Sequence, residues 1–490
     1  MMRLLWAAVW VSLSACAGAS KPGMGDTGER DFPEEFLWGA AMAGFQVDPG
    51  CPTLAEDACV DDQSDWYQWV TDPELVAEGG LHLSGEPLSA GPGHWELYPE
   101  DFDLAANEVG LNSLRVSLEW SRLFPTEPPA DVGVEDLGNY ADPEAVEEYH
   151  RYLDALEERG LVPLVTLNHY TLPLWLHDGK ECHEDIDSCS RRGWADGERM
   201  KAELARYSGW CAREYGENVD LWATLNEPFA VVLAGYLLPS ADRTNPPGVI
   251  KPALAVDVFF SMVEAHAAMY DAVHAWDSTA QVGAVPNLAA IAPHDPDREA
   301  DVLAVEHMDY VYNRLFLEAT VYGHWDRDVD GIAEEERPDL AGRMDFIGVN
   351  YYTRLEAQAL GTPLIAGYPW IDFIPVGSFW NEYPEGLGEV ARLAGSYGVP
   401  VYITENGTSV QEDATERFFV PHLESLQEAM RGGVDVRGYY VWSLIDNYEW
   451  NHGMNLRFGL YEVDINSKAR VARPFVEAYG DLARTGILPR

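Results

Sequence analysis

The stretch LWATLNEP, residues 221–228, decides the fold more than any other part of the sequence. Its first five residues are apolar or β-branched, as in a buried strand, and Asn226, Glu227 and Pro228 follow at once. A glutamate directly after a buried strand is costly unless it is paired or used in chemistry. Parallel barrels place their functional side chains at the carboxyl ends of the strands. The stretch therefore predicts a barrel strand that ends on a functional carboxylate.

Further runs of the same kind recur along the whole chain. They lie at Phe36–Ala41, Leu114–Leu118, Leu161–Leu167, Val282–Val285, Phe346–Val349, Val399–Thr404 and Tyr439–Trp442. Stretches with apolar residues three and four apart, such as Pro143–Arg159 and Met200–Tyr215, separate them and predict helices. Eight strands alternating with helices predict an α/β fold, a single (β/α)8 TIM barrel with long βα loops.

Composition supports one large folded unit. The chain has 490 residues, of which 47% are hydrophobic and 12% aromatic, which is enough for a large core. From residue 31 onward no stretch rich in serine or proline reads as a linker, so residues 31–490 are expected to form one domain. Residues 17–30 are small and polar and predict a flexible tether.

The chain is strongly acidic. Its formal charge is −50, from 82 acidic and 32 basic side chains. Nucleic acid is excluded as an expected partner because phosphate binding requires clustered lysine and arginine. The acidity indicates a surface adapted for solubility; an active site that repels anions is the alternative.

Residues 1–16 predict an export signal. A single Arg3 is followed by an apolar run from Leu4 to Leu13, which is too short to span a bilayer. Leu13-Ser14-Ala15-Cys16 resembles the lipobox of bacterial lipoproteins, which predicts lipidation of Cys16 and an anchor at the outer membrane. Ordinary cleavage after Ala17-Gly18-Ala19 is the alternative. Both place the protein outside the cytoplasm, in the periplasm, at the cell surface or secreted.

The other cysteines include two close pairs. Cys51 with Cys59, and Cys182 with Cys189, lie in short polar stretches where a disulfide could close a loop. Zinc binding at the second pair is the alternative, but the flanking residues lack the spacing of a zinc site. The remaining Cys211 lies in a helical pattern and is expected to be a buried thiol.

A second carboxylate follows another predicted strand. Ile403-Thr404-Glu405-Asn406-Gly407 repeats the arrangement seen at Glu227. With both motifs in place, the sequence from Phe36 to Pro474 resembles glycoside hydrolase family 1, a family of retaining β-glycosidases. The resemblance implies an exo-acting enzyme for terminal β-glucosyl, galactosyl or fucosyl groups, without metal or other cofactor. A small β-glycoside or oligosaccharide is the implied partner, and the oligomeric state is left open.

The resemblance also assigns roles to single residues. Glu227 corresponds to the acid/base and Glu405 to the nucleophile. Arg115 and Tyr352 occupy positions that contact the nucleophile, and Asn226 the position that binds the sugar 2-hydroxyl. Taken alone, Asn226 would more often be a turn residue. The implied substrate-binding residues are Gln46, His169, Asn350, Trp380, Trp442, Glu449, Trp450 and Phe458.

Some positions depart from the family pattern. Tyr170 stands where tryptophan is usual, Thr171 replaces an aspartate, and Phe229 replaces the common tryptophan after Asn-Glu-Pro. These changes lie on the side expected for the leaving group, where Trp380 is expected to stack. They put the aglycone preference in doubt rather than the catalysis. Glu449 implies a neutral sugar, because a carboxylate there repels a phosphate.

Two long loops and two other functions stay open. Residues 48–95 either cap the pocket or decorate the surface, and the same holds for residues 182–194. A non-catalytic carbohydrate-binding relative on the same barrel is the first alternative, although such relatives typically lose one carboxylate. A metal-dependent barrel hydrolase is the second, and the sequence shows no His and Asp ligand cluster for it.

Overall fold

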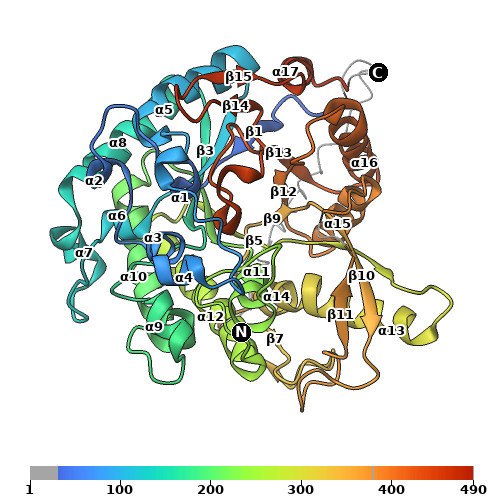
Figure 1. The fold of residues 1–490 in the computed structure, drawn as a ribbon. Helices are drawn as coiled ribbons and strands as arrows, with labels where there is room; N and C mark the ends of the chain where they lie inside the picture. The colour runs from blue at the N-terminus through green and yellow to red at the C-terminus, as the bar shows by residue number, and fades with distance from the viewer. Residues whose placement is uncertain (1–30, 378–379, 489–490) are drawn as a thin grey trace, which may run out of the picture.

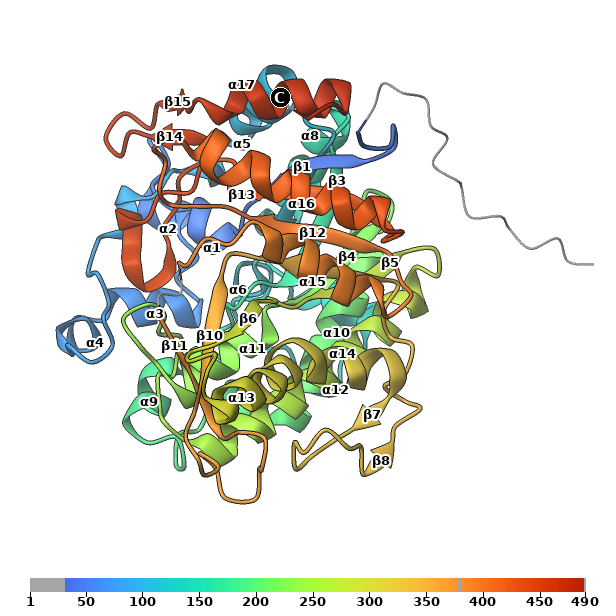
Figure 2. The ribbon, with the colours of Figure 1, turned by 90° about the vertical axis from the view of Figure 1, so that its right-hand side faces the viewer.

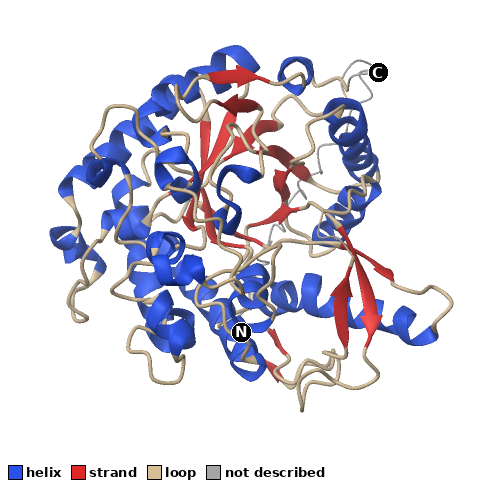
Figure 3. Cartoon of the chain, in the orientation of Figure 1, coloured by secondary structure: helices blue, strands red, loops and turns tan. Residues whose placement is uncertain are grey.

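The computed structural model describes residues 31–377 and 380–488, and the predicted signal and tether lie outside them. Eight parallel strands close into a barrel in the order β1-β13-β12-β9-β5-β4-β3-β2. They gather at the centre of the molecule with the helices around them (Figure 1, Figure 3). This confirms the predicted (β/α)8 barrel. The strands are β1 (Leu37–Ala41), β2 (Ser113–Ser117), β3 (Val162–Asn168), β4 (Leu221–Asn226), β5 (Gln281–Val285), β9 (Phe346–Asn350), β12 (Val401–Asn406) and β13 (Val436–Trp442).

Each predicted strand overlaps an observed one, and the ends coincide or differ by at most three residues. The two predicted helices are also confirmed, as α8 (Pro143–Glu158) and α10 (Gly197–Tyr215). The start of α8 is fixed by Asp142, whose carboxylate accepts hydrogen bonds from the backbone N–H groups of Glu144 and Ala145 at 2.9 and 3.0 Å. Pro143 occupies the first helical position, where no N–H is required.

The remaining helices cover the barrel or lie in its loops. They are α1 (Gly44–Val47), α2 (Glu56–Cys59), α3 (Asp65–Thr71), α4 (Pro73–Ala77), α5 (His94–Asp103), α6 (Trp120–Leu123), α7 (Val134–Leu137), α9 (Gly179–Glu184), α11 (Pro228–Val232), α12 (Pro252–Trp276), α13 (Glu299–Asp309), α14 (Leu315–Leu317), α15 (Glu385–Gly395), α16 (Val420–Arg431) and α17 (Phe475–Thr485). The long apolar helix α12 packs beside α10 on the outside of the barrel.

Small sheets extend the loops at the rim. The strands β6 (Ala290–Pro293), β10 (Arg354–Ala359) and β11 (Phe373–Val376) form a three-stranded sheet beside the barrel (Figure 2). Two further pairs are β7 (His324–Trp325) with β8 (Glu335–Glu336), and β14 (Tyr461–Val463) with β15 (Arg470–Ala472). The long βα loops predicted for the barrel thus carry structure of their own.

The barrel closes where β1 pairs with both β13 and β2. Ala41 at the end of β1 is in register with Trp442 on one side and Arg115 on the other. These residues come from the first quarter and the last tenth of the chain. Closure therefore brings residues distant in the sequence to one end of the barrel, where the functional side chains meet.

Candidate active site

A pocket of about 750 Å³ lies at the carboxyl ends of the barrel strands. Of the residues assigned to the site from the sequence, all but Arg115 line it. The polar and aromatic lining residues are Gln46, His169, Tyr170, Asn226, Glu227, Arg243, Asn287, Tyr312, Asn350, Tyr352, Thr353, Trp380, Glu405, Trp442, Glu449, Trp450 and Phe458. Arg115 is buried and reaches the same site from β2.

Glu405 ends a strand and is held from two sides. One carboxylate oxygen, Oε1, accepts a hydrogen bond from Arg115 Nη1 at 2.5 Å, and the other, Oε2, accepts one from the Tyr352 hydroxyl at 2.6 Å. Burial raises the pKa of Glu405 to about 7; the Arg115 guanidinium opposes this and the nearby charge of Glu227 adds to it. The carboxylate thus has both a cation and a phenol to stabilise its ionised form.

Gly407 keeps the chain after Glu405 close to the last strand. A Cβ at this position would lie 2.1 Å from the backbone oxygen of Trp442, closer than any side chain permits. The Thr-Glu-Asn-Gly order therefore lets β12 run against β13 just where Glu405 and Trp442 enter the pocket.

Glu227 follows β4 in a different setting. Its backbone is in the left-handed region, with φ of 46°, and its N–H donates to the Val285 carbonyl at 2.7 Å. Oε1 accepts a hydrogen bond from Asn350 Nδ2 at 2.9 Å, and Oε2 accepts one from the Tyr170 hydroxyl. The carboxylate is held by neutral donors on both oxygens.

Asn226 joins the two carboxylates through one hydrogen-bond network. Its Oδ1 accepts from Arg115 Nη2 at 2.7 Å and from Asn350 Nδ2 at 3.2 Å, so it contacts a partner of each glutamate. Its Nδ2 donates to His169 Nε2 at 3.1 Å. Asn350, assigned from the sequence to substrate binding, thus contacts Glu227 and Asn226 directly. The network fixes the two carboxylates relative to each other.

The other end of the pocket is polar and deeply buried. Gln46 Nε2 donates to Glu449 Oε2 at 3.0 Å and to Asn447 Oδ1 at 3.1 Å. Burial lowers the pKa of His169 well below its usual value, and the charges of Arg115 and Arg243 lower it further, so the ring is neutral.

Several buried polar atoms in this pocket have no hydrogen-bond partner among the described residues. They are Gln46 Oε1, His169 Nδ1, Arg243 Nη1 and Asn287 Oδ1. Such atoms are costly to bury unless something hydrogen-bonds to them. Both donors and acceptors are present, which suits a ligand with several hydroxyl groups.

Aromatic rings form the walls. The His169 ring lies nearly parallel to those of Trp442 and Trp450, each with centroids 6.0 Å away. On another side the Trp380 and Phe458 rings lie 5.5 Å apart. A sugar ring has apolar C–H faces and polar hydroxyl groups at its edge. Flat aromatic walls beside hydroxyl-binding groups are suited to both.

Comparison with known proteins decides the family. The profile described as glycosyl hydrolase family 1 matches residues 28–486. The chain belongs to this family. It is therefore a glycoside hydrolase, and the match spans the barrel and the pocket described above.

Relatives of this glycoside hydrolase cover nearly its whole length. It is 35% identical to a β-galactosidase of Pyrococcus woesei, over 90% of this chain and 94% of the relative, and 28% identical to β-glucosidase A of Thermotoga maritima, over 91% and 96%. Among solved structures, a β-glycosidase of Thermosphaera aggregans has a TM-score of 0.81 and 31% identity, covering 94% of this chain and 98% of that one.

Two residues that hydrogen-bond to assigned site residues of the hydrolase, Arg243 and Tyr170, were not themselves assigned from the sequence; Asn287, Tyr312 and Thr353 also line the pocket without having been assigned. Arg243 Nη2 donates to Glu449 Oε1 at 3.3 Å, and its guanidinium lies 5.9 Å from the Trp450 ring. Nothing in the surrounding loop sequence marks this arginine. Tyr170 was identified only as a departure from the family pattern; its polar hydroxyl next to His169 was the available sign.

Of the other departures, neither Thr171 nor Phe229 lines the sugar pocket. The Thr171 hydroxyl donates to Glu119 Oε2 at 2.7 Å behind the pocket wall. Phe229 lines a neighbouring apolar cavity together with Leu233 and Tyr312, which also border the sugar pocket. The two substitutions therefore lie around the pocket and not inside it.

Of the two long loops, the first supports the site from behind. No described residue of 48–95 or 182–194 lines the pocket. Trp66 of α3 packs on Trp450 with centroids 4.5 Å apart, and the Tyr448 hydroxyl donates to the Glu86 carbonyl at 2.8 Å. The first loop therefore braces the segment that carries Glu449 and Trp450. It neither caps the pocket nor merely decorates the surface, the two alternatives left open by the sequence.

One acidic group of the described residues has a spacing that could hold a metal ion. It comprises Asp326, Asp328 and Glu334, in and beside the β7–β8 hairpin. None of the three lines the pocket. The chemistry of Glu227 and Glu405 is thus not linked to this group.

Proposed function

We propose that the protein is a retaining exo-β-glycosidase that removes terminal β-D-glucosyl, galactosyl or fucosyl groups through a covalent glycosyl-enzyme. The observation that carries this is the joining of Glu227 and Glu405 by one hydrogen-bond network with different partners on each. A retaining enzyme requires one carboxylate as nucleophile and one as acid/base, about 5–5.5 Å apart. The β-galactosidase and β-glucosidase names of the relatives support these sugars.

In the first step the Glu405 carboxylate attacks the anomeric carbon. The bond between that carbon and the glycosidic oxygen breaks, and Glu227 gives its proton to this oxygen, which leaves as an alcohol. A covalent ester now joins the sugar to Glu405. Arg115 and Tyr352 keep the attacking carboxylate ionised before the step.

In the second step water attacks the same carbon from the side that the alcohol left. Glu227, now a carboxylate, takes a proton from the water, and the ester bond breaks to restore ionised Glu405. Two inversions give net retention. Glu405 carries no charge while it is esterified, so Glu227 loses a repelling neighbour just when it must act as a base.

The deeply buried end of the pocket supports exo-action on a neutral sugar. Gln46 and Glu449 are fully buried there, and Trp442 and Trp450 complete the walls. A single terminal ring can present its hydroxyls to these groups, whereas an internal residue of a polymer would need a second opening. The Glu449 carboxylate, which pairs with Arg243 at 3.3 Å, disfavours a phosphate by charge repulsion.

Hydrolysis of a panel of p-nitrophenyl glycosides, together with a 2-fluoro glycosyl inactivator, tests the proposal. Turnover of the β-glucoside or β-galactoside, with the label found on Glu405 by peptide mass spectrometry, is expected. A folded protein that neither turns over nor takes the label would instead favour a carbohydrate-binding relative.

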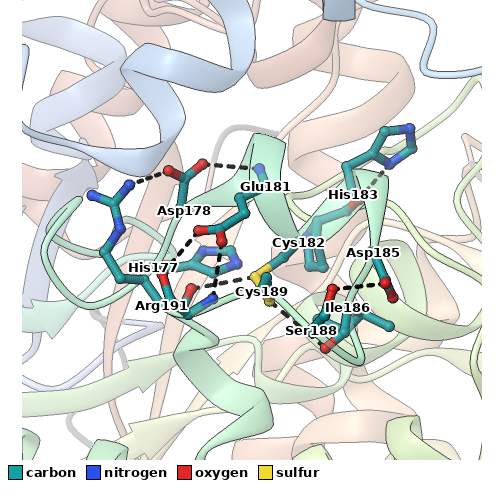
Figure 4. Close-up of a disulfide and its surroundings, with 12 residues drawn as sticks. His177, Asp178, Glu181, Cys182, His183, Asp185, Ile186, Ser188, Cys189 and Arg191 are labelled. Carbon is teal, nitrogen blue, oxygen red and sulfur yellow. Dashed lines mark hydrogen bonds and ion pairs between the residues drawn. A yellow bond between two sulfur atoms is a disulfide. The ribbon is translucent and has the colours of Figure 1, made fainter.

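We also propose that the enzyme is exported and lipid-anchored through Cys16. The described residues support an oxidising location, because Cys51–Cys59 and Cys182–Cys189 are both disulfide-bonded. Cys211 is a buried thiol, as expected from its helical pattern. Figure 4 shows the second bond closing the loop after α9. Metabolic labelling with a palmitate analogue should mark the wild type and not Cys16→Ser; labelling of neither would leave conventional cleavage.

A further inference from the structure

Tyr170 lies against the carboxylate of Glu227 and outside the set of residues assigned above to catalysis. Its hydroxyl donates to Glu227 Oε2, and the side chain is 5% exposed. Since Asn350 occupies Oε1, both oxygens of Glu227 accept a hydrogen bond within the protein. The contact depends on the phenol oxygen alone, so phenylalanine would fill the space without making it.

The loop that carries Tyr170 is held in place by its neighbours. Tyr170 itself has φ of 73°, a conformation that a tyrosine rarely adopts. Asn168 Nδ2 donates to the Thr171 carbonyl at 2.9 Å, and the Thr171 hydroxyl donates to buried Glu119 at 2.7 Å. The Tyr170 ring also packs edge-on against Trp450, with centroids 4.9 Å apart. A strained residue held from both sides is typical of a functional position.

The surroundings of Glu227 show what this hydroxyl supplies. Glu405 has Arg115 in direct contact, but no cation of the described residues hydrogen-bonds to Glu227. The titratable and charged groups around Glu227 are Glu405, Tyr170, His169, Arg115, Arg243, Tyr312, Tyr352 and Glu449. The negative charges of Glu405 and Glu449 oppose the ionisation of Glu227. The two donors that contact its carboxylate, Tyr170 and Asn350, favour the ionised form.

We propose that Tyr170 is a positioning residue that stabilises the ionised form of Glu227 and so sets the pH at which it changes from acid to base. The proposal rests on the proposed acid/base role of Glu227. A hydrogen bond from a neutral hydroxyl to a carboxylate strengthens when the carboxylate is charged. Burial, and next the charge of Glu227, raise the pKa of Tyr170 well above its usual value, so the phenol stays a donor.

The contact stabilises the same carboxylate form of Glu227 in both half-reactions. In the first step Glu227 must give up its proton, and the hydroxyl stabilises the carboxylate that forms. In the second step the carboxylate must take a proton from water, and the same bond holds it ionised at lower pH. Without the hydroxyl, Glu227 keeps its proton to higher pH in both steps.

Tyr170→Phe tests the proposal through the pH dependence of kcat/KM. For an alkyl β-glycoside, the alkaline limb should move up by about 1 pH unit, since one hydrogen bond to a carboxylate has that effect, while the acidic limb, set by Glu405, stays. Reactivation of the 2-fluoro glycosyl-enzyme below the neutral range should slow about tenfold, the factor that one unit corresponds to.

Tyr207→Phe is the matched control. Tyr207 is equally buried, and its hydroxyl donates to the Leu118 carbonyl at 3.3 Å, away from the pocket. Neither limb of the pH profile of Tyr207→Phe should move. If Tyr170→Phe lowers the rate at all pH values without moving the alkaline limb, Tyr170 only packs and the proposal is wrong. Failure of the wild type to label Glu405 would instead refute the proposed function.

Discussion

The surroundings of Glu405 and of Glu227 differ in the kind of partner that each carboxylate has. Glu405 contacts a guanidinium and a phenol, whereas Glu227 contacts an amide and a phenol. Both are buried at strand ends within one pocket. A fixed cation favours a permanent charge, while neutral donors allow a group to gain and lose a proton. The difference supports the proposed roles of Glu405 as nucleophile and Glu227 as acid/base without reference to sequence order.

The largest effect is expected when Glu405, the carboxylate that pairs with Arg115, is removed. Glu405→Ala should lower kcat by about 10⁵-fold or more, because no covalent intermediate can form. Added azide should restore turnover by attacking the anomeric carbon directly, and the product should have inverted configuration by NMR.

Glu227→Asp at the other carboxylate serves as a reference for the azide experiment. It keeps a carboxylate but withdraws it from Asn350 and Tyr170. Its product should keep the retained configuration at whatever rate remains. A retained azide product from Glu405→Ala would contradict the assignment of Glu405 as nucleophile.

Removal of the second carboxylate should have a smaller and substrate-dependent effect. Glu227→Ala should slow the first step about 10³-fold for alkyl glycosides, the usual contribution of a general acid, and spare dinitrophenyl glycosides, which need no protonation. Pre-steady-state measurement of phenol release separates this step from deglycosylation. Equal slowing of both substrates would show that Glu227 is not the acid.

These two glutamates are also the part of the site that the sequence predicts most directly. Each follows a short apolar, β-branched run that is typical of a buried strand, and eight such runs predict the barrel. Barrel closure then brings Arg115, from the middle of β2, and Trp442, from the end of β13, beside them.

The partners supplied by loops were not predictable in this way. Arg243 lies after α11 in a loop without a repeating pattern, and Tyr170 reaches Glu227 because its backbone is left-handed. Both depend on the path of an irregular loop, which periodicity does not describe. The bracing of Trp450 by Trp66 likewise joins segments almost 400 residues apart.

Tyr352 offers a direct counterpart to Tyr170, since each phenol donates to one of the two carboxylates. Tyr352→Phe should lower kcat/KM about 10²-fold, as loss of one preorganised donor does, and move the acidic limb to higher pH. The alkaline limb should stay. Steady-state rates of both phenylalanine variants across pH 4–10 test this; movement of the same limb in both would remove the distinction between the two carboxylates.

The last prediction needs no substitution and concerns the effect of pH on the unaltered enzyme. Burial raises the pKa of Glu405 to about 7, so its ionised form, the nucleophile, is lost as the pH falls through that value. We expect kcat/KM to fall about tenfold per unit below it. The same proton is bound more tightly in the folded than in the unfolded chain, so at this site acidification favours the fold while it removes activity. Circular dichroism should therefore show a folded protein at a pH where hydrolysis has already fallen. If unfolding and loss of activity coincide, the acidic limb of the pH profile reports unfolding. If activity falls first, the limb reports protonation of Glu405, and the Arg115 guanidinium beside it sets the pH at which this happens.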